Sequence, residues 1–126
     1  MKRLFLASVL LICMAANPVL AEDKTSSTDE PIILINTFIV PEGKVAESIA
    51  FWEKAADFMR TQPGYISTTL HQTILPDAKF ELINVAKWRS VGDFKNASHA
   101  MKTQSGIKPI DGLIPNPSLY KVIISD

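Results

Sequence analysis

The chain has 126 residues with 13 basic and 13 acidic side chains, so its formal net charge at pH 7 is zero. This balance argues against a nucleic-acid-binding protein, which usually carries a basic surplus on one face, and against tight electrostatic docking on anionic lipid. The length allows one domain with a modest hydrophobic core.

Residues 1–21 have the pattern of a secretory signal peptide. Lys2 and Arg3 precede a short apolar block, and Val19 and Ala21 stand at the −3 and −1 positions of a cleavage site. Because the block is short for a membrane anchor, we predict an exported protein, periplasmic or secreted, with no stable membrane anchor. An uncleaved N-terminal anchor is the alternative.

Cys13 is the only cysteine, and it lies inside the predicted signal peptide. Ile12 precedes it, where a lipoprotein signal has a small residue, so we do not expect lipidation. The mature chain would therefore have no disulfide and no cysteine metal site. Residues 22–30 are polar and predict a disordered leader, which leaves residues 31–126 as the folded domain.

Residues 32–40, IILINTFIV, predict a first strand that is buried on both faces, with Asn36 as a polar exception. Residues 44–61 then predict a helix, because their apolar side chains recur at steps of three and four. The apolar face of this helix would comprise Val45, Ile49, Phe51, Trp52, Ala55, Ala56, Phe58 and Met59.

Residues 65–75 and 80–88 predict two strands around the turn PDAK. If the strand ends next to the turn pair directly, His71 lies opposite Asn84 on one face of the sheet. A register slip of one residue would instead move these side chains to opposite faces. The sequence thus predicts a polar pair on an otherwise apolar hairpin.

Ser90 predicts the start of a second helix, because Asp93 follows it in a capping-box-like spacing. Residues 105–117 are broken by glycine and proline and predict a long connection with room for one short helical turn. Residues 118–125 predict the last strand. The order β-α-β-β-α-β is the α+β, ferredoxin-like arrangement, in which the first and third strands are neighbours and Asn36 would join Asn84 and His71.

The segments INTFIVPEGK, QPGYISTTLHQTILPDAKFELINVAKWRSVGDF and NPSLYKVI together resemble the antibiotic biosynthesis monooxygenase (ABM) domain family. This resemblance implies a homodimer in which two ferredoxin-like sheets form a dimeric α+β barrel, with a ligand cavity between each sheet and its helices. The family includes quinol and polyketide monooxygenases that use O₂ without metal or flavin, haem-degrading enzymes, and members of no known activity.

Haem-degrading members of the family use an Asn on the first strand, a Trp in the second helix and a His further along that helix. Asn36 matches the first, but Ala97 and Ile107 stand at the other two places, so the resemblance makes haem degradation the less favoured activity. The two histidines, His71 and His99, have no metal-ligand spacing. We therefore expect no metal and no other cofactor.

Cofactor-free oxygenation of a phenol needs a base, hydrogen-bond donors for the phenolate oxygen and a dry apolar cavity. His71 is the candidate base, since its ordinary pKa lies near neutrality, and Asn36 and Asn84 are candidate donors. The candidate residues that bind an aromatic substrate by stacking are Trp52, Phe58 and Trp88.

Each assignment has an ordinary structural alternative. His71 would be solvated, Asn36 and Asn84 would bond to each other or to backbone, and Trp52 and Trp88 would pack in the core or at a dimer interface. The sequence therefore leaves two functions open. One is an exported, cofactor-independent monooxygenase that oxidises a phenolic or quinol-like small molecule, and the other is a non-catalytic dimeric module for small-molecule binding or stress.

Overall fold

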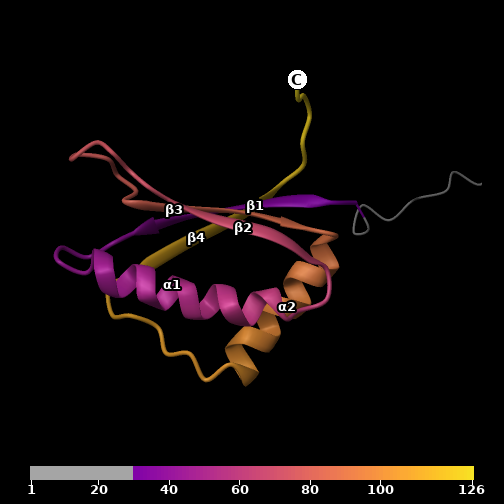
Figure 1. Ribbon diagram of the computed structural model, residues 1–126, viewed down its shortest axis with the longest axis horizontal. Coiled ribbons are helices and arrows are strands. Elements are labelled where there is room, and N and C mark those ends of the chain that lie inside the picture. The colour runs from indigo at the N-terminus through magenta and orange to yellow at the C-terminus, as the bar shows by residue number, and fades with distance from the viewer. Residues whose placement is uncertain (1–29) are drawn as a thin grey trace, which may run out of the picture.

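The computed structural model describes residues 30–126, so the predicted signal peptide and all of the predicted leader except Glu30 lie outside the described residues. Its elements are β1 (Ile32–Ile39), α1 (Val45–Arg60), β2 (Tyr65–Gln72), β3 (Leu82–Trp88), α2 (Val91–Gln104) and β4 (Ile114–Tyr120). The strands form one antiparallel sheet in the order β2-β3-β1-β4, and both helices cover the same face (Figure 1). This confirms the predicted ferredoxin-like fold.

The core follows from the alternation of side chains along the two central strands. Because successive residues of a strand point to opposite faces, the even-numbered residues of β1 and β3 face the helices. Ile32 and Leu34 on β1 pack with Ala86 and Trp88 on β3 and with Ala97 on α2. This cluster lies where β1 begins and β3 ends, and Phe38 and Leu82 are buried near the other end of the same two strands.

Strand β4 begins earlier than the sequence predicts. It spans Ile114–Tyr120 and includes Pro115 and Pro117, whereas the prediction was a strand at residues 118–125 after a long connection. Residues 105–117, where the sequence left room for one short helical turn, contain no helix. Proline argues against a central strand, but β4 pairs only with β1 and lies at an edge of the sheet, where proline is tolerated.

The predicted register of the hairpin between β2 and β3 is wrong by one residue. His71 pairs with Ile83, and Leu70 is the residue opposite Asn84. The backbone N–H of Thr73 donates to the carbonyl of Glu81 at 2.9 Å, so the loop holds residues 74–80 rather than the four residues of a PDAK turn. Since this loop has an odd number of residues, the side chains of β2 from Ser67 to Gln72 lie on the face opposite to the one predicted, whereas a β-bulge between Tyr65 and Ser67 keeps Tyr65 on the same face as Trp88.

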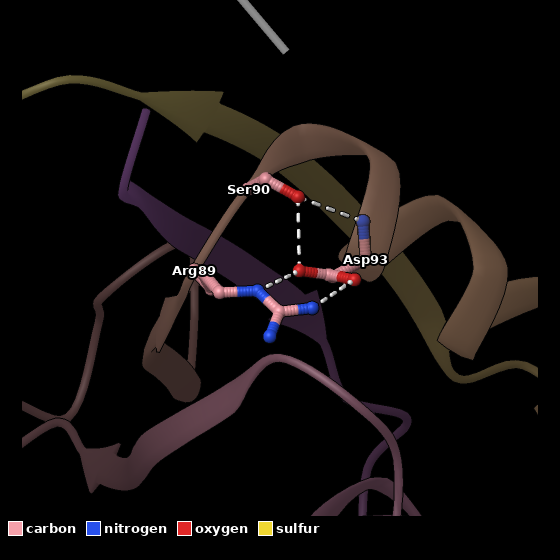
Figure 2. Close-up of polar contacts among 3 residues, drawn as sticks. All are labelled: Arg89, Ser90 and Asp93. Atoms are coloured by element: carbon pink, nitrogen blue, oxygen red, sulfur yellow. Dashed lines mark hydrogen bonds and ion pairs between the residues drawn. The ribbon is translucent and has the colours of Figure 1, made fainter. Parts of the chain in front are cut away.

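The predicted cap of α2 is confirmed and is reinforced by an ion pair (Figure 2). Ser90 Oγ accepts from the backbone N–H of Asp93 at 3.1 Å, and Arg89 donates to both carboxylate oxygens of Asp93 at 2.7 and 3.0 Å. The hydrogen bonds from the Arg89 side chain hold the pKa of Asp93 below its ordinary value, so its carboxylate is ionised at neutral pH. The backbone N–H of Arg89 also donates to Gly64 at 2.8 Å, which joins the start of β2 to this helix end.

Gly64→Ala tests the close contact at this junction. Gly64 has φ +85°, and a Cβ there would lie 2.4 Å from Asp93 side-chain atoms, so alanine would be strained and would also displace the ion pair. Gly43→Ala is the matched control, because Gly43 has φ +75° with nothing near its Cβ position. In urea denaturation we expect about 1–2 kcal/mol of destabilisation for the control and a larger loss for Gly64→Ala. Equal losses would contradict the proposed contact.

The helix-free face of the sheet is apolar at its centre. Ile33 and Ile35 on β1 and Ile83 and Val85 on β3 point to this face, and Ile39 is 37% exposed at its end. Figure 1 shows the C-terminal segment leaving β4 on this same side, and Ile123 and Ile124 in it are 82% and 86% exposed. Such a surface is typical of a protein–protein interface.

We predict that a second copy of the chain covers this face. Ile35→Glu should convert the dimer to a monomer, because an unpaired carboxylate is costly to bury in an apolar interface. Static light scattering at micromolar protein measures the mass, and Lys54→Glu on the exposed surface of α1 is the control that should remain dimeric. A monomeric wild-type protein, or a dimeric Ile35→Glu variant, would refute the prediction.

Candidate functional site

A cavity of about 420 Å³ lies between the sheet and the two helices. Phe51, Trp52 and Ala55 of α1 line one wall, and Pro115 and Pro117 of β4 line part of the opposite side. The volume falls in the range of small-molecule sites, which are mostly apolar with a few placed polar groups. The core residues Leu34, Ala86 and Trp88 also line it, so the cavity directly borders the hydrophobic core.

Two amides face each other on the floor of this cavity. Asn36 on β1 pairs directly with Asn84 on β3, and both line the cavity. Thr68 on β2 donates from its hydroxyl to Asn84 Oδ1 at 2.6 Å. That bond fixes the orientation of the Asn84 amide, because its oxygen is engaged and its N–H₂ group is left to donate elsewhere.

Two buried polar atoms of the cavity lining lack a hydrogen-bond partner within residues 30–126. They are Asn36 Oδ1, an acceptor, and Trp88 Nε1, a donor. Roughly 90% of buried polar groups in proteins are paired, so an exception calls for an explanation. A ligand that offers both a donor and an acceptor would satisfy these atoms, which marks the cavity as the candidate binding site.

The ring of Trp88 is held firmly in place. It is 1% exposed, and the rings of Tyr65 and Phe94 meet it edge-on with centroids at 5.6 and 5.7 Å. Edge-to-face contacts of this kind add to the stabilisation from buried area. Trp88 therefore belongs both to the core and to the wall of the cavity, so the core positions its indole N–H.

The predicted placement of His71 beside Asn84 is wrong. With the observed register, its side chain points to the helix-free face, where it is exposed and its Nδ1–H donates to the carbonyl of Ile83 at 3.2 Å. The sheet separates this imidazole from the cavity. The geometric basis for making His71 the base of the cavity is therefore removed.

The structure brings four of the six candidate residues together at the cavity, namely Asn36, Asn84, Trp52 and Trp88. Phe58 is half-buried on α1 but does not line the cavity. The sequence reasoning missed Thr68, and it also missed Ser98 and Lys102 on α2. The correct hairpin register would have identified Thr68, whereas no sequence signal separates Ser98 and Lys102 from a solvated helix surface.

Within residues 30–126 no group of three or more His, Cys, Asp or Glu side chains is arranged to hold a metal ion. In the same part of the chain, neither helix is long and apolar enough to cross a membrane. His99 lies exposed on α2 and does not line the cavity, so the residue arrangement of the haem-degrading relatives is not reproduced here.

The family profile described as "Antibiotic biosynthesis monooxygenase" (ABM) matches residues 31–104, which is more than half of the chain. The chain belongs to this family. A candidate monooxygenase from Shewanella loihica, of known structure, is 47% identical, with a TM-score of 0.70 over 76% of this chain and 97% of that one. No curated protein matches the chain.

More distant ABM-like structures share the fold alone. SnoaB from Streptomyces nogalater, a cofactor-independent oxygenase, is 21% identical over 76% of this chain and 96% of that one, with a TM-score of 0.57. A haem-degrading protein from Mycobacterium tuberculosis is 19% identical over 76% of this chain and 94% of that one, with a TM-score of 0.54. The ABM fold thus accommodates more than one chemistry, and the residues of the cavity must decide between them.

The two opposed amides of this ABM domain give a matched stability test. Asn36→Leu removes a buried acceptor that has no partner, so we expect the ligand-free protein to gain about 1–2 kcal/mol in free energy of unfolding. Asn84→Leu instead leaves the Thr68 hydroxyl without its acceptor, so we expect a loss of about the same size. Urea denaturation measures both changes, and a shift of the same sign in both variants would contradict this account.

Proposed function

We propose that the protein is an exported, cofactor-independent monooxygenase that oxidises a phenolic or quinol-like small molecule. One observation carries the proposal, namely that Asn36, whose buried Oδ1 has no hydrogen-bond partner, lines the apolar cavity and pairs directly with Asn84 on the neighbouring strand. A phenol offers a hydroxyl proton to the acceptor, and its anion accepts from the donor. Membership of the ABM family supports the oxygenase chemistry.

The proposed reaction needs only the substrate and O₂. The phenol loses its proton, and the phenolate passes one electron to O₂. The resulting superoxide and phenoxyl radicals combine at a ring carbon that carries one hydrogen, and the adduct takes up a proton to give a hydroperoxide. Cleavage of the O–O bond with loss of water leaves a carbonyl at that carbon, so one oxygen atom enters the product, a quinone, and the other enters water.

The cavity residues contribute binding and electrostatic stabilisation. Asn84 donates to the phenolate oxygen, where negative charge concentrates before electron transfer, and a fixed donor of this kind acts strongly in an apolar site. Asn36 Oδ1 accepts a hydrogen bond from the hydroxyl group of the bound neutral phenol. Trp52 of α1 provides an aromatic surface beside the substrate ring.

In the part of the chain that the structure describes, no His, Asp or Glu side chain lines the cavity. In this mechanism the substrate therefore releases its proton to water, and stabilisation of the anion by Asn84 replaces a general base. The rate should then follow ionisation of the substrate phenol, whose ordinary pKa is about 10, lowered by the amide donor. It should not follow an imidazole that titrates at about 6.5.

Export and dimerisation complete the proposal. The predicted signal peptide supports export, and cell fractionation with an antibody to the mature chain would locate the protein. ABM domains are typically dimeric, and the apolar helix-free face supports a homodimer here. The two cavities of such a dimer would lie on the outer sides of the paired sheets, because each cavity lies on the helix-covered face.

Oxygen uptake by the purified mature protein with a panel of hydroquinones and polyphenols tests the activity. We expect uptake with one or more compounds, a kcat lowered on the order of 10²-fold in Asn84→Ala, and an unchanged rate in His71→Ala. Asn36→Leu, which should fold well, is a second variant that should lose activity. The rate should rise through alkaline pH with no step near pH 6.5.

Two results would overturn parts of the proposal. A large loss of rate in His71→Ala would indicate that His71, on the helix-free face of the sheet, acts as the base. This result would contradict the cavity mechanism. Thermal stabilisation of the protein by phenols without any oxygen uptake would favour the binding module instead, because a ligand that binds only the folded state stabilises it by mass action.

A further inference from the structure

The cavity has a second polar region, on α2. Among residues 30–126, Lys102 is the only charged residue in the lining, and Ser98, which also lines the cavity, precedes it by one helical turn. Residues four apart on a helix lie side by side on its surface. The cavity therefore has neutral amides on the sheet and an ammonium group beside a hydroxyl group on the helix.

Neither polar group on α2 is engaged elsewhere in residues 30–126. The ion pairs in this part of the chain join Arg60 to Asp57 and Arg89 to Asp93, and they do not involve Lys102. The hydroxyls of Thr103 and Ser105 donate to backbone carbonyls of their own helix, at 2.9 and 2.5 Å. The Ser98 hydroxyl makes no such bond among the described residues and is available to a ligand.

An ammonium group beside a free hydroxyl suits a carboxylate, which accepts from both through charge-assisted hydrogen bonds. A neutral ligand gains nothing from the ammonium group, and a cationic ligand would be repelled by it. A ligand that spans the cavity from the sheet to α2 would place a phenolic hydroxyl at the amides and an anionic group at Lys102.

We propose that Lys102 and Ser98 bind an anionic substituent of the substrate, so that the substrate class is a dihydroxyaromatic carboxylate. This inference rests on the proposed function for the phenolic end of the molecule. Lys102 is then a specificity-determining residue, since it contacts the part of the substrate that does not react. Lys95 is exposed on the same helix but does not line the cavity, so it serves as a matched control.

The test compares 1,4-dihydroxynaphthalene with its 2-carboxylate, with binding measured by calorimetry in the absence of oxygen. Because Lys102 is exposed, we expect the wild-type protein to prefer the carboxylate by only about 2- to 5-fold. Lys102→Met should abolish the preference without weakening binding of the neutral compound, and Lys95→Met should preserve it. Ser98→Ala should reduce it in part, and raising the ionic strength should weaken it.

The outcomes separate this inference from the proposed function. Equal affinity of the wild-type protein for both compounds, a preference that survives in Lys102→Met, or binding of neither compound overturns the assignment of Lys102. If the preference and its loss in Lys102→Met are observed but no oxygen is consumed under air, the anionic subsite stands and the monooxygenase proposal falls. If oxygen is consumed but the wild-type protein binds both compounds with equal affinity, the monooxygenase proposal stands and the anionic subsite falls.

Discussion

The antiparallel pairing of β1 with β3 is the constraint on which the candidate site depends. It sets Asn36 opposite Asn84 on the face that the helices cover, and a shift of one residue would place the two amides on opposite faces of the sheet. The same register brings Ile32 opposite Trp88 and Leu34 opposite Ala86, which are core residues. The hydrophobic core therefore fixes the position of the polar pair, since any slip would also expose buried apolar side chains.

The helix-covered face of the sheet contributes both to stability and to binding. At the end where α2 begins, Trp88 is packed between Tyr65 and Phe94, whereas towards the middle of the same strand Asn84 borders a cavity. The unpartnered Asn36 oxygen lowers the stability of the fold, as is common at functional sites. The close packing around Trp88 offsets this loss. A fully packed domain of this size would be more stable, but it would have no room for a ligand.

Local signals in the sequence were sufficient for most of the fold. Ser90 and Asp93 marked the start of α2 because a cap depends on neighbouring residues alone, and the order of elements implied that Asn36 and Asn84 are neighbours. His71 was misplaced because the parity of the hairpin loop decides which face a residue occupies, and the sequence does not reveal that parity. Lys102 was missed because a lysine on a helix flank shows no pattern that distinguishes solvent from a cavity.

The two prolines of β4 have a consequence for how copies of the chain can associate. A proline that faced β1 would remove a bond of the ladder, so the nitrogens of Pro115 and Pro117 are expected on the outer side of this edge. An incoming strand would find carbonyl oxygens there but few amide hydrogens to complete a ladder, and natural proteins use this device to prevent open-ended fibrous stacking. The prolines therefore disfavour the addition of a further strand at the β4 edge. They do not hinder a dimer that forms through the apolar helix-free face of the sheet.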